Sequence, residues 1–337
     1  MSYQTRNLAE TDIEALKPRI LELFHANGMP DAEIRFEWLY RSDYARNHLC
    51  SRVLFHNDRL VGIISMLPVP AGKRVIASMA NLLVDERHRT LGPALILMKS
   101  LIADSCAQLS PDLIIGRPNR KADILLKRLR FQSLGQAIRQ TWVANPVAFM
   151  PLPSSLKSFG GRLLSPLMRT GLWVQERSAA VRQGRIGTPD WRRIDDPKQI
   201  RHRLPPYLYW RYFEIPNGNS RLAVPTSSDL NQAYLIYSVS PQGTLYISDF
   251  EPEDNAAAQP LLARFMRQML KRMPLRNFSI CCLNSPSLSS ALDSLGFIER
   301  IDGDELTVYL GSCDGDNRTA CAQLPVDLPL FPSRFDF

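Results

Sequence analysis

One stretch constrains the fold more than any other: an apolar strand, a basic turn, a glycine and a helix follow one another along the chain. The strand is predicted over Arg74 to Val84, where apolar residues predominate. The helix is predicted over Leu95 to Cys106, where apolar residues recur at helical spacing. This order of elements places the start of a helix next to the end of a buried strand.

The turn between strand and helix has the features of an anion site. The first N–H groups of a helix lack internal partners, and the helix dipole favours negative charge there. Gly92 lets the backbone approach a ligand, and Pro93 suits the first helical position, where a missing N–H costs nothing. Arg87, His88 and Arg89 add positive charge. An ordinary strand–loop–helix connection explains the same residues equally well, because one glycine is a weak signal.

Other phosphate-binding signatures are absent from this turn. No Gly-Lys-Ser/Thr follows the glycine, and no G-x-G-x-x-G occurs there. The run Arg89-Thr90-Leu91-Gly92-Pro93-Ala94 instead resembles the R/Q-x-x-G-x-G/A signature of the GNAT superfamily of acyl-CoA-dependent acyltransferases. Val84 stands where that family has V-x-P-x-x-R, with Glu86 replacing the usual proline. Residues 119–131 resemble the family's next segment, and the resemblance covers roughly residues 50–145.

The resemblance implies an acyl-CoA co-substrate, with acetyl-CoA as the expected donor and no metal. The pantetheine arm would run beside the strand end like an added strand, and the backbone amides of the turn, except that of Pro93, would hold the pyrophosphate. Asn119 would hydrogen-bond the pantetheine or an adjacent backbone group, with a purely structural turn as the equal alternative. The cofactor-binding residues implied in this way are Leu82, Leu83, Val84, Arg89, Thr90, Leu91, Gly92, Pro93, Ala94 and Asn119.

The second half of the chain echoes the first. Trp210 matches Trp38 ahead of a pair of predicted strands, and Phe250-Glu251-Pro252 stands where Val84-Asp85-Glu86 stood. The corresponding turn, at Glu253 and Asp254, has no glycine and carries acidic charge, which caps a helix but repels a pyrophosphate. We therefore predict a duplicated unit with one cofactor site, in the first copy.

The predicted fold class is α/β (α+β), with two tandem GNAT-like domains, each a mixed, mostly antiparallel twisted sheet flanked by helices. The predicted boundaries are residues 1–145 for the domain with the acyl-CoA site, 146–189 for a connector, 190–311 for the degenerate domain and 312–337 for a C-terminal tail. The connector is expected to be a helix packed across both domains. A basic amphipathic segment over residues 155–175 that touches a membrane surface is the less favoured alternative.

Acyl transfer to an amine also needs a proton acceptor and a proton donor. Relatives often use a Glu on the long strand and a Tyr on the later helix. Here the strand holds no carboxylate, and the Tyr position falls on Leu126. On the strand itself, Ser78 and Asn81 are candidates to position a water.

Two carboxylates of the second copy are candidate bases. Asp249 and Glu251 lie on the strand that matches Arg74 to Val84 and, two residues apart, share a face unless a bulge intervenes. A solvated strand end is the favoured alternative for both. The candidate acids, each of which also suits a core or interface position, are Tyr207, Tyr209, Tyr212 and Tyr246.

Composition narrows the choice of partner only slightly. The 45% hydrophobic and 22% charged fractions are those of a globular chain, and the net charge of +8 suits an anionic ligand without selecting one. No nucleic-acid motif is present and the basic residues are spread along the chain, so we expect no nucleic-acid partner. The six cysteines lack C-x-x-C spacing and the start is polar, which together predict a reduced cytoplasmic protein.

The expected function is acyl-CoA-dependent N-acyl transfer to a small-molecule amine, an amino sugar or an aminoacyl acceptor, by direct attack on the thioester. The alternative is a catalytically degenerate module that binds acyl-CoA or a partner, which the missing Glu and Tyr favour. We expect the two copies to pack as one rigid unit with the acceptor site between them.

Overall fold

The structure of the chain is a computed structural model. The structure describes residues 2–29, 31–71, 74–119, 122–136, 138–150, 154–182, 188–226, 233–252, 257–282, 286–300 and 307–313. The acidic turn at Glu253 and Asp254, and the predicted tail after Cys313, lie outside the described residues.

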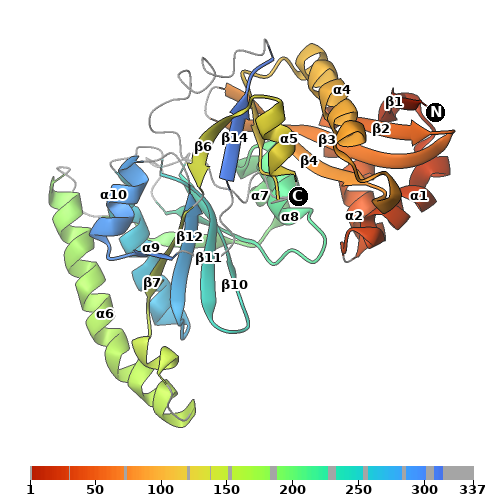
Figure 1. The fold of residues 1–337 in the computed structure, drawn as a ribbon. Coiled ribbons are helices and arrows are strands. Elements are labelled where there is room, and N and C mark those ends of the chain that lie inside the picture. Colours follow the sequence, from red (N-terminus) through yellow and green to blue (C-terminus); the bar gives the residue numbers. More distant parts are fainter. Residues whose placement is uncertain are drawn as a thin grey trace.

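The described strands form two seven-stranded sheets (Figure 1). The first sheet has the order β1-β2-β3-β4-β5-β14-β6, and the second has the order β13-β7-β12-β11-β10-β9-β8. All paired neighbours are antiparallel except β4 with β5 and β11 with β12. The predicted class, two mixed and mostly antiparallel sheets flanked by helices, is confirmed.

The elements before the connector follow the predicted order. The strands are β1 (Tyr3–Asn7), β2 (Cys50–His56), β3 (Arg59–Ala71), β4 (Arg74–Val84), β5 (Leu113–Gly116), β6 (Gln132–Gln136) and β7 (Ile138–Val143). The α-helices are α1 (Ile13–Ala26), α2 (Ala32–Phe36), α3 (Asp43–His48), α4 (Leu91–Leu109) and α5 (Asp123–Arg128). Short helical turns are η1 (Leu8–Glu10), η2 (Glu37–Arg41), η3 (Glu86–His88) and η4 (Pro146–Phe149).

The elements from the connector onward repeat that pattern in part. The helices are α6 (Ser154–Arg182), α7 (Pro197–Arg203), α8 (Pro206–Phe213), α9 (Ala258–Arg272) and α10 (Pro286–Ser294). The strands are β8 (Trp191–Ile194), β9 (Arg221–Pro225), β10 (Tyr234–Val239), β11 (Thr244–Glu251), β12 (Asn277–Cys282), β13 (Ile298–Arg300) and β14 (Thr307–Gly311).

Two strands cross between the halves. Strand β7, from the first half of the chain, pairs with β12 and β13 in the second sheet. Strand β14, from the end of the second half, lies between β5 and β6 in the first sheet. The predicted division at residue 145 therefore does not separate the two sheets, because apolar alternation identifies a strand but not the sheet it joins.

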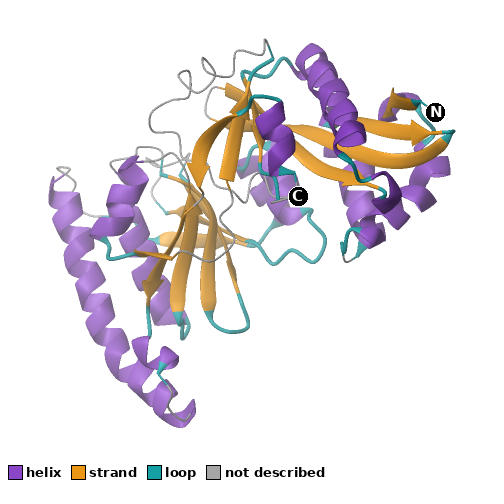
Figure 2. Ribbon diagram, in the orientation of Figure 1, coloured by secondary structure: helices purple, strands orange, loops and turns teal. Residues whose placement is uncertain are grey.

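Three apolar clusters fill the layers around the sheets. One lies between the first sheet and helix α4, and another lies between the second sheet and helix α9. The third joins the two halves and holds α1, α2, α8 and side chains of β3 and β10. In Figure 2 helices accordingly cover the outer face of each sheet. This shared core makes the two halves one packed body.

Corresponding strands of the two copies carry the same irregularity. Between the pairs Ile63–Leu83 and Ser65–Ala80, two residues of β4 stand against one of β3. In the second sheet Ser248 is the extra residue of β11 against β10. Each bulge is close to the end of the strand before the turn that precedes a long helix. The match in sheet position and bulge supports duplication independently of the sequence spacing.

Residues at turns and helix starts explain where several elements begin and end. Asn57 and Asp58, with φ of 50° and 59°, form a hairpin turn between β2 and β3, as an Asn-Asp pair between two strands favours. Helix α1 begins one residue later than a Thr11 cap implies, because the Asp12 carboxylate accepts from the N–H groups of Glu14 and Ala15. Helix α4 begins at Leu91, so Pro93 is the third helical residue, still within the first turn, where N–H groups need no internal acceptor.

The connector helix α6 packs along α9 of the second half (Figure 1). Glu176 is 5% exposed and pairs with Arg267 at 2.9 Å and Arg264 at 3.5 Å, both on α9. Burial raises the pKa of Glu176, and the neighbouring Arg264 opposes that rise. Within the described residues, no helix is both long enough and apolar enough to cross a bilayer.

The structure joins Cys106 of α4 to Cys313 in a disulfide, which corrects the prediction that the cysteines are all reduced. The two cysteines are 207 positions apart, so their spacing carries no signal. Cys313 follows β14, and the bond therefore ties the crossing strand to the helix that covers the first sheet. Cys50 is buried as a free thiol, as a core role requires.

Candidate functional site

The candidate site opens where β4 and β5 part. The parallel pairing of these strands covers only Ile76 to Ser78 on β4, and β4 runs on to Val84 while β5 ends at Gly116. The bulge at Asn81 and Leu82 lies in the part of β4 that pairs with β3 but not with β5. Because the strands diverge there, side chains from both line the space between them.

An outer cleft of about 950 Å³ runs from this point to the start of α4. Its described lining consists of Ala26, Asn27, Leu82, Val84, Arg89, Thr90, Leu91, Ala94, Asn119, Ala122, Ile124 and Leu125. Seven of these were predicted as cofactor-binding residues from the sequence: Leu82, Val84, Arg89, Thr90, Leu91, Ala94 and Asn119. Strand end, turn and helix start thus meet on one concave surface.

The other three predicted residues lie beside the cleft rather than in its described lining. Leu83 is 4% exposed and packs into the core shared by the two halves. Pro93 is buried in the first turn of α4. A Cβ built on Gly92 has nothing within 4 Å, so this backbone faces open space.

Arg89 fixes the mouth of the outer cleft. Its guanidinium donates to the carbonyl oxygen of Val84 at 3.3 Å and to Oδ1 of Asn27 at 3.2 Å. These bonds join the end of β4 to the end of α1 and hold a positive charge at the start of α4. The cap residue Thr90 makes no side-chain bond to the helix, so its hydroxyl does not occupy the first N–H groups.

Asp85 holds the turn in place through its carboxylate and its backbone N–H. Its carboxylate pairs with Arg19 and accepts from the N–H of Arg87 at 3.0 Å, while its own N–H donates to the carbonyl of Val61. Burial alone would raise the pKa of Asp85, but the bonds from Arg87 and Arg19 outweigh it and the pKa is lowered. Nearby, the Tyr3 hydroxyl lies 3.0 Å from Nδ1 of His88, so His88 is held by a local contact.

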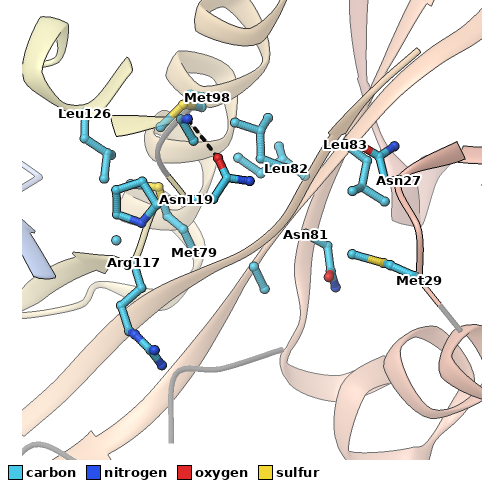
Figure 3. Close-up of a pocket in the computed structure, with 15 residues that line it drawn as sticks. Asn27, Met29, Met79, Asn81, Leu82, Leu83, Met98, Arg117, Asn119 and Leu126 are labelled. Carbon is cyan, nitrogen blue, oxygen red and sulfur yellow. Dashed lines mark hydrogen bonds between the residues drawn. The ribbon is translucent and has the colours of Figure 1, made fainter. Parts of the chain in front are cut away.

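Asn119 has the structural role that was left open. Its Oδ1 accepts from the N–H of Ala122 at 3.0 Å, which shapes the turn into α5 (Figure 3). The side chain still lines the outer cleft, so turn formation and ligand contact are compatible at this position.

An inner cavity of about 270 Å³ continues from the outer cleft (Figure 3). The two share Asn27, Leu82, Asn119 and Ala122. The remaining described lining of the inner cavity is Met29, Ile64, Met79, Ala80, Asn81, Leu83, Met98, Gly116, Arg117, Pro118 and Leu126. Leu126 thus lies in the cavity at the position where the family resemblance implied a Tyr.

The two polar candidates of β4 have buried polar atoms without a hydrogen-bond partner. Ser78 is 1% exposed and its hydroxyl is unpaired. Both Oδ1 and Nδ2 of Asn81 are buried and unpaired, and its φ is 51°, in the left-handed region. Buried polar groups are normally paired, so an unpaired one that lines a cavity suggests a contact with a bound molecule.

The carboxylates of the second copy lie elsewhere. Asp249 is fully buried and accepts from the hydroxyls of Tyr212 at 3.3 Å and Tyr234 at 3.2 Å. The bulge at Ser248 precedes Asp249, so Asp249 and Glu251 still share a face, toward the core between the halves. Neither carboxylate belongs to the described lining of the inner cavity or the outer cleft.

Several lining residues of the inner cavity went unpredicted, among them Asn27, Met29 and Arg117. Arg117 follows the strand β5 directly, and residues just after the carboxyl end of a parallel strand are frequent ligand contacts. That rule was a usable signal for Arg117, whereas no local pattern marks Met29. Among the described residues, no group of three or more His, Cys, Asp or Glu side chains is placed to hold a metal ion.

Comparison with known proteins identifies the architecture. No family model matches the sequence, and no curated protein matches it either. Among solved structures, a GCN5-related N-acetyltransferase from Kribbella flavida superposes with a TM-score of 0.60 at 14% identity, over 93% of this chain and 73% of that one. The chain has a duplicated GNAT fold.

Two further structures agree. A conserved Enterococcus faecalis protein described as a probable N-acyltransferase gives a TM-score of 0.61 at 14% identity, and a GCN5-related N-acetyltransferase from Anabaena variabilis gives 0.58 at 13%. Both cover 93% of this chain and 73% of their own. The GNAT fold thus extends across both halves, including the second copy.

Proposed function

We propose that this protein is an acyl-CoA-dependent N-acyltransferase, with acetyl-CoA as its expected donor and a small amine, an amino sugar or an aminoacyl group as its acceptor. The observation that carries the proposal is the outer cleft, which joins the end of β4, the basic turn and the start of α4. Similarity in fold to N-acetyltransferases supports the same reaction class.

The diphosphate of CoA fits the start of α4. The N–H groups of Leu91, Gly92 and Ala94 are in the first turn of a 19-residue helix, where they lack internal acceptors and the helix dipole favours an anion. Arg89 adds a fixed positive charge beside them. The pantetheine arm would then follow Leu82 to Val84 and bring the thioester to the bulge at Asn81.

The reaction is a direct transfer. The amine nitrogen attacks the thioester carbonyl carbon, a C–N bond forms, the C–S bond breaks, and the thiolate takes up a proton as CoA leaves. The nitrogen must lose a proton to a base. Ser78 and Asn81 cannot accept a proton at neutral pH and would only orient a water. Asp249 and Glu251 are the proposed bases, although they lie outside the described lining of both cavities.

A specific observation favours a second candidate, a module that binds acyl-CoA without turning it over. Leu126 occupies the cavity position where a Tyr was implied, and β4 brings no carboxylate to the site. A leucine can neither donate nor accept a proton, so position 126 cannot supply a general acid. Release of free CoA thiol from acetyl-CoA in the presence of a panel of amines separates the two candidates.

Cofactor binding is tested by calorimetric titration of CoA against a matched pair of variants. Gly92→Asp and Gly92→Asn have side chains of equal size, and the open space at Gly92 admits either. Only the aspartate places a negative charge near the diphosphate, and like charges about 4 Å apart cost roughly 1–4 kcal/mol. We expect one site per chain, about tenfold or weaker binding in Gly92→Asp, and a smaller loss in Gly92→Asn. Two sites per chain, or equal binding by both variants, would contradict the proposal.

A further inference from the structure

The polar lining of the inner cavity is chemically one-sided. It consists of the amides of Asn27, Asn81 and Asn119 and the guanidinium of Arg117. No Asp or Glu occurs among the described residues that line it. The side chains there thus present hydrogen-bond donors and a positive charge, which suit an anionic group and disfavour a second cation.

The backbone conformation and the unpaired amide of Asn81 both suit a contact with a ligand. It is in a bulge, where the β3–β4 register shifts, and its backbone is left-handed, a conformation that asparagine tolerates better than most residues. Both polar atoms of its amide are buried without a partner while the side chain lines the cavity. A bound molecule that both accepts and donates hydrogen bonds would satisfy the two atoms together.

Asn81 lies beside Met29 (Figure 3), and Arg117 lines the same cavity. Arg117 comes from the end of β5 and Asn81 from the bulge of β4. Met98 and Leu126 also line the cavity, from α4 and α5. A molecule held in the inner cavity therefore has a donor amide and a guanidinium in the same lining.

We propose that the inner cavity binds the acceptor of the reaction, and that this acceptor carries a carboxylate close to its reacting amine, as an α-amino acid does. Nδ2 of Asn81 donates to the carboxylate, Oδ1 accepts from the amine, and Arg117 supplies the opposite charge. A polycationic acceptor would instead bring positive charge against Arg117. The inference rests on the proposed acyl transfer and names the acceptor class for the same site.

The test compares matched pairs of acceptors, each an amino acid and its carboxamide, which are nearly equal in size while only the amino acid carries a carboxylate. The measured quantity is the ratio of kcat/KM for the two members of each pair with acetyl-CoA. The wild-type protein should favour the amino acid by tenfold or more. Asn81→Asp, which keeps the side-chain size and the tolerance for a left-handed backbone, should reverse the ratio. Arg117→Gln should bring the ratio close to one.

Asn47→Asp, on the exposed face of α3, adds the same charge away from the cavity and should keep the wild-type ratio. Where turnover is undetectable, calorimetric titration of the same pairs into the CoA-loaded protein replaces kcat/KM, with the same expected order. A wild-type preference for the carboxamide, a ratio unchanged by both cavity variants, or no binding of either member at millimolar concentration would overturn the inference. The affinity of the wild-type protein for CoA is measured separately. Absence of CoA binding would reject the proposed function. CoA binding without the expected acceptor preference would reject only the acceptor class.

Discussion

The indole rings of Trp38 and Trp210 stack on one another with centroids 4.6 Å apart and planes 15° from parallel. Nε1 of Trp38 donates to the carbonyl of Trp210 at 3.3 Å, and Nε1 of Trp210 donates to Oγ of Ser42 at 2.9 Å. The two tryptophans occupy matching positions in the duplicated sequence. The copies therefore meet through equivalent residues, as subunits do across a two-fold axis.

Truncation of this contact should destabilise both halves together. Trp210 is 1% exposed, and replacement of a buried Trp by Ala typically costs about 3–5 kcal/mol. We expect Trp210→Ala to lower the denaturation midpoint while a single cooperative transition remains. Trp173→Ala, at an indole that is 42% exposed, is the control and should have little effect. Two separate transitions in the wild-type protein would show that the shared core does not couple the halves.

The exchange of β7 and β14 predicts that the first half cannot fold alone. A fragment of residues 1–145 lacks β14, so nothing joins β5 to β6, and its β7 has no partner strands. We expect this fragment to be insoluble or to lack a cooperative melt by circular dichroism. Co-expression with residues 146–337 supplies the missing strands and should restore a soluble complex. A monomeric, cooperatively folded fragment that binds CoA would refute this view of the strand exchange.

Asp85 gives a prediction in pH. Its pKa is lowered in the folded protein, so the stability that it contributes is fully present above its unfolded value of about 3.9 and is lost as pH falls through the lower folded value. Asp85→Asn removes the ion pair with Arg19 and should cost about 1–3 kcal/mol at neutral pH. Chemical denaturation of both proteins across pH should show this difference shrinking below about pH 4. A stability difference that grows on acidification would contradict the lowered pKa of Asp85.

The base assignment is tested with Asp249→Asn and Glu251→Gln. If acyl transfer is detected, a general base requires a large fall in kcat/KM and loss of the acidic limb of its pH profile in at least one variant. Asp249→Asn should also lose about 1–3 kcal/mol of stability, because the fully buried carboxylate accepts from two tyrosines. Wild-type pH profiles in both variants would instead favour water-relayed proton loss.

Much of this architecture could be predicted from local patterns. The strand Arg74–Val84, the hairpin turn at Asn57 and the turn before α4 follow from periodicity, positive-φ residues and helix-end chemistry. These signals depend on neighbours in the sequence. They also explain why seven predicted cofactor residues, six of them between Leu82 and Ala94, line one cleft.

The remainder depends on long-range pairing, which a local pattern does not encode. Nothing in Ile138–Val143 indicates that it pairs with β12 rather than with the first sheet, since both environments bury apolar residues. Likewise, no local pattern indicates the disulfide between Cys106 and Cys313. That Arg117 and Asn81 line one cavity depends on the parting of β4 and β5, which the sequence does not show.

The most direct test of the central claim, that the first copy holds acyl-CoA at the start of α4, is a crystal structure of the protein with CoA. We predict one CoA per chain, with its diphosphate within hydrogen-bond distance of the N–H groups of Leu91, Gly92 and Ala94. Its pantetheine arm should lie beside Leu82, with the thiol directed toward the bulge at Asn81. A CoA bound only to the second copy, or one that makes no contact with the turn before α4, would contradict the account.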